Sequence, residues 1–326
     1  MKKIGIVTFH NAWNNGAFLQ AFAMQMFLDE HGYQANIVNT GVKFQSIAPN
    51  NVNANEWWRE YEKRLVKCHN LLNNSLEKCY DAIVYGSDEI WNLNSNGANP
   101  IFWGYNLKSP RKIAYAPCSG GYGIKSCMRF PCKVFMAMWA LNFNFHAISA
   151  RDKNTKRFIK RFSCRTVAEC LDPTFLADFT PYRGENGRGD YIAVYSYGLQ
   201  KETINKIKEF GNAHNCKIVY TGSYCDWADE NPILDPIEWF NVMYHAKYVF
   251  TSTFHGCVFS IICHREFYVV DTNSAKVNDL LERLRLTERK IKSFDNIPSQ
   301  INFSIVQQRL NELKQISEDY ILSNIK

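Results

Sequence analysis

One histidine stands where an apolar, β-branched segment gives way to a helical pattern. The segment ends in Ser252 and Thr253, and His255 and Gly256 follow at the predicted start of a helix. The positive end of a helix dipole favours the neutral imidazole, which can act as a base. A lone histidine is more often structural, but this position favours function. We therefore predict His255 as an acid or base, with Ser252, Thr253 and Gly256 at the substrate.

Two adjacent carboxylates come soon after another apolar run. Residues 81–85 predict a buried strand, and Asp88 and Glu89 follow it. Open α/β sheets bind ligands at the carboxyl ends of their strands. Asp88 is therefore a candidate second acid or base. The alternative is that Asp88 only caps the following turn.

Arg151 also lies just beyond a predicted strand, at residues 145–149, and the run Leu-Asp-Pro-Thr lies downstream at 171–174. A guanidinium in such a position can bind a carboxylate or a phosphate with two parallel hydrogen bonds. We predict Arg151 as a substrate ligand. The alternative is a surface salt bridge with Asp152.

A polar loop separates the first predicted strand, at residues 3–9, from a predicted helix at 16–30. Asn11, Asn15 and Gly16 belong to this loop and to the helix start that it leads into. The free N–H groups and dipole of a helix N-terminus attract anions, so we predict these three residues at a ligand. The sequence leaves open the alternative that Asn15 only caps the helix.

These candidates lie on a regular alternation of strands and helices. Residues 3–39 read as strand, helix and strand, a unit that crosses over right-handed into a parallel sheet. A polar stretch with three glycines at 179–190 is the best linker, and the alternation restarts after it. We therefore predict an α/β protein with two Rossmann-like domains, whose parallel sheets face a central cleft.

We place the N-terminal domain at residues 1–182 and the C-terminal domain at 190–300. Residues 301–326 predict an amphipathic helix that packs back on the first domain. Residues 43–79 also read as helical, with Trp57 and Trp58 as anchors.

The composition of the 326 residues is that of a folded protein, with 46% hydrophobic and 21% charged residues. No apolar stretch is long enough to span a membrane, and the first residues do not read as a signal peptide. Eleven cysteines without such a signal indicate reduced thiols, so we expect a cytoplasmic protein. Their spacing matches no zinc site, and we expect neither a metal nor a cofactor.

The formal net charge is +7, and several cations gather in the predicted helix at residues 153–161. A solvated face is the more common meaning of such a run. The alternative is attraction to phosphorylated substrates or to the inner, anionic face of a membrane, which would make the protein peripheral there. No motif indicates nucleic-acid binding, and no feature indicates an oligomeric state.

Taken in order, these segments resemble the polysaccharide pyruvyl transferase family across most of the chain. The shared motifs are His-Asn…Asn-Gly-Ala at 10–17, Gly-Ser-Asp…Trp-Asn at 86–92, Ile-Ser-Ala-Arg-Asp at 148–152, Leu-Asp-Pro-Thr at 171–174 and Ser-Thr-Phe-His-Gly at 252–256. Their order and spacing carry the resemblance more than any single motif does.

The resemblance implies a GT-B-like fold and a role in exopolysaccharide biosynthesis. It implies transfer of the pyruvyl group of phosphoenolpyruvate to a sugar or a lipid-linked glycan, with a pyruvate ketal as product. Arg151 then becomes a ligand of phosphoenolpyruvate and His255 an acid, base or phosphate contact. Some members carry an arginine where this chain has Thr253, so Arg265 or Lys276 would supply that positive charge.

Two other functions fit the same features. One is a glycosyltransferase that uses a nucleotide sugar on the same architecture. The other is a non-catalytic glycan-binding member of the family, which the missing arginine at Thr253 would favour. A dehydrogenase is disfavoured because the glycine fingerprint of dinucleotide sites is missing.

Overall fold

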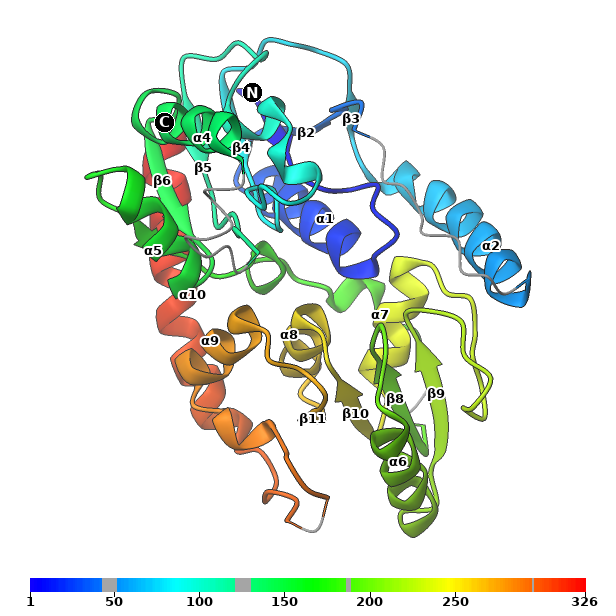
Figure 1. Cartoon of the computed structure of the whole chain (residues 1–326). Helices are drawn as coiled ribbons and strands as arrows, with labels where there is room; N and C mark the ends of the chain where they lie inside the picture. Colours follow the sequence, from blue (N-terminus) through cyan, green and yellow to red (C-terminus); the bar gives the residue numbers. More distant parts are fainter. Residues whose placement is uncertain (43–51, 121–129, 186–188, 295) are drawn as a thin grey trace.

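The computed structural model describes residues 1–42, 52–120, 130–185, 189–294 and 296–326. Within these ranges the chain forms two parallel sheets, each packed against helices (Figure 1). The predicted fold class is confirmed: two Rossmann-like α/β units face each other, as in the GT-B fold.

The first sheet has seven parallel strands in the order β3-β2-β1-β4-β5-β6-β7. Their bounds are β1 Lys3–Val7, β2 Gln34–Val38, β3 Asn74–Ser75, β4 Ala82–Tyr85, β5 Lys112–Ala114, β6 Ala147–Ala150 and β7 Ala168–Glu169. The chain builds outward from β1 through β2 and β3, then returns to add β4 on the other side. Loops after β1 and β4 therefore diverge, and such a reversal is where open α/β sheets bind ligands.

Helices cover both faces of this sheet. One face packs against α1 (Asn15–Glu30) and α2 (Val52–Cys68), and the other packs against α4 (Pro131–Phe143) and α5 (Lys153–Phe162). All four residues of β4 are buried, which explains its unbroken apolar sequence.

Helix α1 is apolar on nearly every side because it lies between the two units. Its Phe18 and Phe22 belong to a core that continues into Trp239 and Phe259 of the second unit. The helix is capped by Asn14, whose side chain accepts a hydrogen bond from the backbone N–H of Ala17 at 3.1 Å. The proposed capping role of Asn15 is therefore wrong, because Asn15 is already the first helical residue.

The second sheet has four parallel strands in the order β11-β10-β8-β9. The strands are β8 Tyr191–Tyr195, β9 Lys217–Thr221, β10 Tyr248–Thr251 and β11 Glu266–Val269, and the helices between and after them are α6 Lys201–Ala213, α7 Pro236–His245, α8 Phe254–Ile262 and α9 Ala275–Leu284. Its strand order reverses between β8 and β10, so this sheet has a ligand-binding edge of the same kind.

The last helix, α10 (Phe303–Ile325), runs along both units (Figure 1). Tyr320 donates a hydrogen bond to the carbonyl of Ala114 in β5 at 3.0 Å, and Arg309 donates to the carbonyl of Arg283 in α9 at 3.3 Å. We keep the division of the chain at residues 182–190 as a proposal, since one core extends through α1 into both units.

The sequence overestimated the helix at 43–79. Residues 43–51 lie outside the described ranges, and α2 ends at Cys68. The chain then adds β3 to the edge of the sheet, where the N–H of Ile37 donates to the carbonyl of Asn73 at 2.8 Å. Trp57 is buried and Trp58 packs against the same core, as expected for anchors.

Within the described ranges, none of the helices combines the length and the apolarity that crossing a bilayer requires.

Candidate functional site

In each sheet the strand order reverses at one point, between β1 and β4 in the first and between β8 and β10 in the second. The loops at these two points face each other between the sheets. From the first unit come the loops after β1, β4 and β6, and from the second comes the start of α8, directly after β10. The two units meet closely there: a Cβ built on Gly16 would lie 2.2 Å from the ring of His255. Only glycine permits this approach of α1 to α8.

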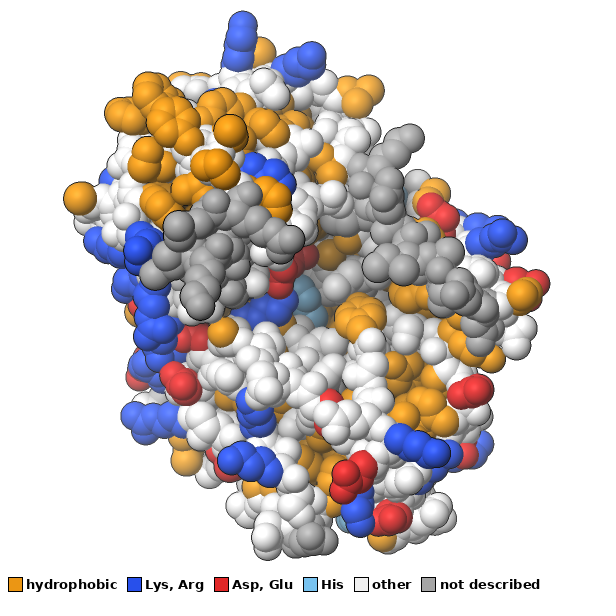
Figure 2. Space-filling model, in the orientation of Figure 1, with side chains coloured by type: hydrophobic (Ala, Val, Ile, Leu, Met, Phe, Trp, Pro, Cys, Tyr) orange, Lys and Arg blue, Asp and Glu red, His pale blue; other side chains and the backbone are white. Residues whose placement is uncertain are grey.

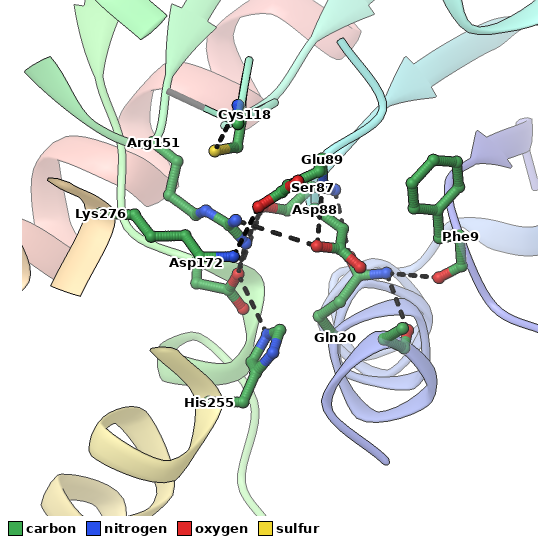
Figure 3. A network of polar contacts seen from close by, with 12 residues as sticks. Phe9, Gln20, Ser87, Asp88, Glu89, Cys118, Arg151, Asp172, His255 and Lys276 are labelled. Carbon is green, nitrogen blue, oxygen red and sulfur yellow. Dashed lines mark hydrogen bonds and ion pairs between the residues drawn. The ribbon is translucent and has the colours of Figure 1, made fainter. Parts of the chain in front are cut away.

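The site contains a buried arginine, Arg151. Arg151 follows β6, has a side chain only 1% exposed, and donates from Nη1 to Oδ2 of Asp172 at 2.8 Å (Figure 3). The Arg151 guanidinium also lies over the ring of Phe254, 4.3 Å from its centroid. The surface salt bridge to Asp152 that the sequence left open does not form, because Asp152 instead caps α5.

Asp172 connects the two candidate site residues Arg151 and His255. Its Oδ2 accepts hydrogen bonds from Arg151 and from the Ser87 hydroxyl, the latter at 3.2 Å, and lies 3.6 Å from Nε2 of His255. Burial raises the pKa of a carboxyl, but contact with His255 and the charge of Arg151 outweigh it and hold the pKa of Asp172 well below its usual range. Asp172 therefore stays a carboxylate that orients both groups.

Several buried polar atoms of the site have no hydrogen-bond partner. Among the described residues, no partner lies within hydrogen-bond distance of Nε and Nη2 of Arg151 or of Nε2 of His255. A buried donor without a partner costs about 1–3 kcal/mol. Such groups are rare in folded proteins, and their concentration here points to an anionic ligand.

His255 owes its position to the start of α8. Thr253 is the N-cap of this helix, and its hydroxyl accepts from the backbone N–H of Gly256 at 3.0 Å. The side chain of His255 is 7% exposed and is held between Gly16 on one side and Asp172 on the other.

Asp88 lies on the far side of the guanidinium. Its Oδ1 is 3.8 Å from Nη2 of Arg151, and its side chain is 14% exposed. The same oxygen accepts from the backbone N–H of Glu89 at 2.8 Å, so Asp88 also organises the turn after β4. The turn contact that the sequence offered as the alternative therefore forms, and the acid or base role of Asp88 stays a prediction.

Lys276 and Glu89 form a second ion pair across the two units. Their Nζ and Oε1 atoms are 2.7 Å apart, and both side chains are less than a third exposed. Burial opposes the charge on each, but the partner charge prevails: it raises the pKa of Lys276 and lowers that of Glu89 to about 2. Both groups therefore stay charged across the neutral pH range.

A cavity of about 360 Å³ opens beside this ion pair. It is lined from both units, by Glu89, Cys118, Gly120, Asp152, Asn154, Asn273, Ser274, Ala275 and Lys276. Burial raises the pKa of Cys118 to about 12, so its thiol stays neutral and is a poor nucleophile. The polar lining suits a hydroxyl-rich ligand.

The loop after β1 is fixed by Gln20 of α1. Its Nε2 donates to the carbonyl of Phe9 at 2.8 Å, and its Oε1 accepts from the backbone N–H of Ser87 at 3.1 Å. Gln20 thus joins the loops after β1 and β4, as Figure 3 shows. Of the predicted loop residues, Asn11 donates to the carbonyl of Val42 and Asn15 accepts from the Tyr61 hydroxyl.

The remaining predicted residues of the second unit have different surroundings. Ser252 shares a hydrogen bond of 2.7 Å with Ser196, which joins the loops after β8 and β10. A Cβ on Gly256 would lie 2.0 Å from Oγ1 of Thr251, so Gly256 permits tight packing of α8. Arg265 follows the other end of α8, where it donates to the carbonyl of Cys263. Of the two cations suggested for the missing arginine, Lys276 is the one brought to the site.

Sequence reasoning did not assign roles to several residues of the network. Asp172 lies in the Leu-Asp-Pro-Thr motif, and Glu89 is adjacent to Asp88, so both carried a signal. Ser87 lies in the Gly-Ser-Asp motif, whereas Gln20 carried no signal beyond its place in the predicted helix. The described ranges contain no group of three or more His, Cys, Asp or Glu side chains arranged to hold a metal ion.

Comparison with known proteins identifies the chain's relatives. A family model described as polysaccharide pyruvyl transferase matches residues 14–274, a range that includes Gly16, Asp88, Arg151, Asp172 and His255. No curated protein matches the chain.

Among solved structures, a functionally uncharacterized protein from Klebsiella pneumoniae has a TM-score of 0.51 at 12% identity, with 86% of this chain and 88% of that chain covered. UDP-GlcNAc 2-epimerase from Methanocaldococcus jannaschii, in complex with UDP-GlcNAc and UDP, has a TM-score of 0.48 at 10% identity, covering 96% and 99%. The UDP-GlcNAc-bound epimerase from Neisseria meningitidis has 0.47 at 9%, covering 99% and 100%. At these identities the similarity concerns the fold alone.

Proposed function

The chain belongs to the polysaccharide pyruvyl transferase family, and from that premise we propose that it transfers a pyruvyl group from phosphoenolpyruvate to two hydroxyls of a sugar. The product would be a pyruvate ketal on a surface-polysaccharide precursor. The acceptor would be a sugar or a lipid-linked glycan. The ten described cysteines are all free thiols, which is compatible with a cytoplasmic place of action.

The observation that carries the proposal is the set of unused donors on Arg151. Nη1 is held by Asp172, while Nε and Nη2 are buried and find no hydrogen-bond acceptor among the described residues. Two N–H groups on one guanidinium match the two oxygens of a carboxylate or phosphate. Phosphoenolpyruvate has both groups.

The two helix N-termini that meet at the site support an anionic donor. Helix α1 begins at Asn15 and α8 at Phe254, and Gly16 lies against His255 where they approach each other. Each N-terminus presents free N–H groups and the positive end of a dipole. A phosphate between them would be stabilised by both helices.

The site also contains carboxylates that a donor would have to replace. Asp88 faces Arg151 at 3.8 Å, and Glu89 pairs with Lys276 at 2.7 Å. Asp172, by contrast, is buried on every side and stays with Arg151. We propose that the donor takes the place of Asp88 at Nη2, and that the released Asp88 becomes available as a base.

The chemistry assigns a role to each group. A proton from His255 goes to the methylene carbon of phosphoenolpyruvate, which leaves an oxocarbenium-like centre at the adjacent carbon. A sugar hydroxyl attacks that carbon and loses its proton to Asp88. A second hydroxyl of the sugar then attacks the same carbon, loses its proton to solvent or to the departing group, and inorganic phosphate leaves with the electrons of its C–O bond. Asp172 acts as a positioning residue for Arg151 and His255.

Lys276 takes the place of a cation that the chain lacks. Thr253 occupies a position where some family members have arginine, and here Thr253 serves as the N-cap of α8. The Lys276 ammonium enters from α9 and reaches the loop after β4. We propose that it binds the donor phosphate and that Glu89 holds it in place when the donor is absent.

Thermal unfolding with added ligands tests the donor. A ligand that binds only the folded protein raises the midpoint by mass action. Phosphoenolpyruvate should raise it, and a panel of nucleotide sugars should not. Arg151→Lys keeps the charge but loses the two-pronged geometry, so its response to phosphoenolpyruvate should be lost.

Arg289→Lys is the matched control, because Arg289 is equally buried and lies outside the network. It should lower the midpoint without ligand yet keep the response. A rise with a nucleotide sugar alone would overturn the assignment of the donor and favour glycosyl transfer.

A further inference from the structure

Helix α4 presents its largest side chains to solvent. Cys132, Phe135, Trp139 and Phe143 recur at spacings of three and four residues, so they form one stripe along the helix. Phe135 is 60% exposed, Trp139 50% and Phe143 69%. Met138 lies beside the stripe. We call this set the α4 stripe.

The opposite side of α4 carries smaller side chains than the stripe does. Its fully buried positions are Ala137, Ala140 and Leu141, which pack on the sheet. Most surface helices bury their large apolar residues and expose polar ones. The reversed arrangement here exposes aromatic surface that water does not favour, and an exposed apolar patch of this kind marks an interaction surface.

Basic side chains lie next to the stripe on α5. The two helices are joined by a hydrogen bond of 2.9 Å from Asn142 to the carbonyl of Phe162. Lys153 and Lys156 pair with acidic side chains, but the described residues place no carboxylate within ion-pair distance of the exposed Arg157, Lys160 and Arg161. Figure 2 shows apolar side chains gathered at the upper left of the molecule and Lys and Arg side chains along the edge below them.

We propose that the α4 stripe and Arg157, Lys160 and Arg161 of α5 form a binding surface for an anionic lipid bilayer. Aromatic side chains prefer the boundary between headgroups and acyl chains, and Trp139 and Phe143 are suitable for that boundary. Arg157, Lys160 and Arg161 would contact lipid phosphates at the same time. An apolar stripe beside exposed cations is the combination that such a surface requires.

The charges favour a membrane over a second copy of the chain. A symmetric dimer through the α4 stripe would repeat the same apolar and basic patch on both partners, and neither α4 nor α5 contains an acidic residue to pair with the cations. A nucleic acid would be attracted by the cations, but a row of phenylalanine and tryptophan on a convex helix gives it no groove. An anionic bilayer offers acyl chains to the α4 stripe and phosphates to the cations of α5.

The surface is separate from the proposed reaction. No residue of the α4 stripe belongs to the network around Arg151, and lipid binding can be measured without donor or acceptor. Failure of one proposal therefore leaves the other standing.

Flotation of the full chain with vesicles tests the surface. The protein should float with vesicles containing phosphatidylglycerol and bind phosphatidylcholine vesicles far more weakly. Neutralising one cation near a membrane weakens binding about fivefold, so Arg157→Gln/Lys160→Gln/Arg161→Gln should lose roughly a hundredfold in affinity. Trp139→Ser/Phe143→Ser should lose binding even at low salt, since the apolar contact is removed.

Control variants separate this surface from general stickiness. Ile305→Ser/Ile316→Ser removes apolar side chains of α10 that are 56% and 51% exposed, and Lys201→Gln/Lys292→Gln removes exposed charge from the second unit. Both should bind vesicles as the unchanged protein does. Thermal melts of all variants check that they fold.

Three outcomes would overturn the proposal. The first is no flotation with anionic vesicles. The second is flotation that folded α4 variants retain. The third is a dimer in analytical ultracentrifugation that Trp139→Ser/Phe143→Ser separates into monomers, which would assign the stripe to a second copy of the chain.

Discussion

Two regions of the molecule each bury an arginine, Arg289 and Arg151, and they differ in how many nitrogens of the guanidinium have a hydrogen-bond acceptor. Arg289 is 1% exposed, and each nitrogen of its guanidinium has an acceptor: Glu288 at Nε, Glu266 at Nη1 and the carbonyl of Ser299 at Nη2. These contacts connect β11 to the segment before α10. The charge is fully used within the protein, as expected for a structural ion pair.

Arg151 is just as buried, but only one of its nitrogens is firmly bound, to Asp172. The other donors stand at the meeting point of two sheets, beside His255. Burial alone therefore does not mark a functional cation in this protein. Donors left without acceptors at the carboxyl ends of strands do, and each prediction below tests that distinction.

The largest effect is expected at His255. Replacing His255 with glutamine removes the proposed proton donor, so turnover should fall by about 10²–10⁴. Stability should change by no more than about 2 kcal/mol, because Asp172 keeps its hydrogen bonds from Arg151 and Ser87. Phosphate release from phosphoenolpyruvate in the presence of an acceptor measures turnover, and urea unfolding measures stability.

Glu288→Gln gives the corresponding change beside Arg289, and its turnover should equal that of the unchanged protein. Near-normal turnover in folded His255→Gln would remove His255 from the mechanism and weaken the contrast between the two regions.

A smaller effect is expected at Gly16. A Cβ at this position would lie 2.2 Å from the imidazole, so Gly16→Ala must push α1 and His255 apart. Displacing a catalytic group by about 1 Å can lower turnover about 10²-fold. The strain should also destabilise the fold by about 1–3 kcal/mol.

Gly211→Ala is the control for Gly16→Ala. Its Cβ would lie 3.1 Å from the carbonyl of Cys216 in the second unit, away from the network. It should change the unfolding midpoint but leave turnover unchanged. If Gly16→Ala kept full turnover, the close approach of α1 to His255 would be a packing feature alone.

Much of the fold could be predicted because its strands are short apolar runs bounded by turns. The strands at 82–85 and 248–251 carry this pattern plainly, and their order along the chain fixed the parallel arrangement. Helix α4 was not predicted because apolar residues lie on both its exposed and its buried side, so its sequence has no alternation of an apolar and a polar face. The end of α2 was missed because the edge strand β3 has only two residues.

The candidate site was predictable only in part, for a physical reason. Arg151, Asp88 and His255 each follow a strand, so their position in the sequence indicated the ligand-binding edge. Asp172 follows no long strand, and its role depends on three partners far apart in sequence: Ser87, Arg151 and His255. No local pattern reports such a contact. From the sequence, Arg265 and Lys276 were equally good candidates for the missing positive charge. The structure distinguishes them, because Lys276 of α9 contacts Glu89.

The smallest effect is expected for the ion pair between Lys276 and Glu89. Lys276 is the main group that lowers the pKa of Glu89 to about 2 against the effect of burial. A lowered carboxyl pKa stabilises the fold above the unfolded value near 4.5, and this contribution is lost as the pH falls toward 2. Lys276→Met removes the main group that opposes the effect of burial, so the pKa of Glu89 should rise. The variant should therefore be less stable by on the order of 2 kcal/mol at pH 7.

This difference should shrink as the pH falls from about 4.5 toward 2, since Glu89 of the unchanged protein is increasingly protonated there and its ion pair with Lys276 is lost. Urea unfolding at a series of pH values measures it. Lys156→Met breaks a pair of the same 2.7 Å length with Glu169, but its side chains are 37% and 30% exposed, so its effect should stay below about 1 kcal/mol. A constant difference for Lys276→Met across this pH range would mean that packing, not charge, gives Lys276 its effect. The donor-binding role proposed for the ammonium would then depend on ligand titrations alone.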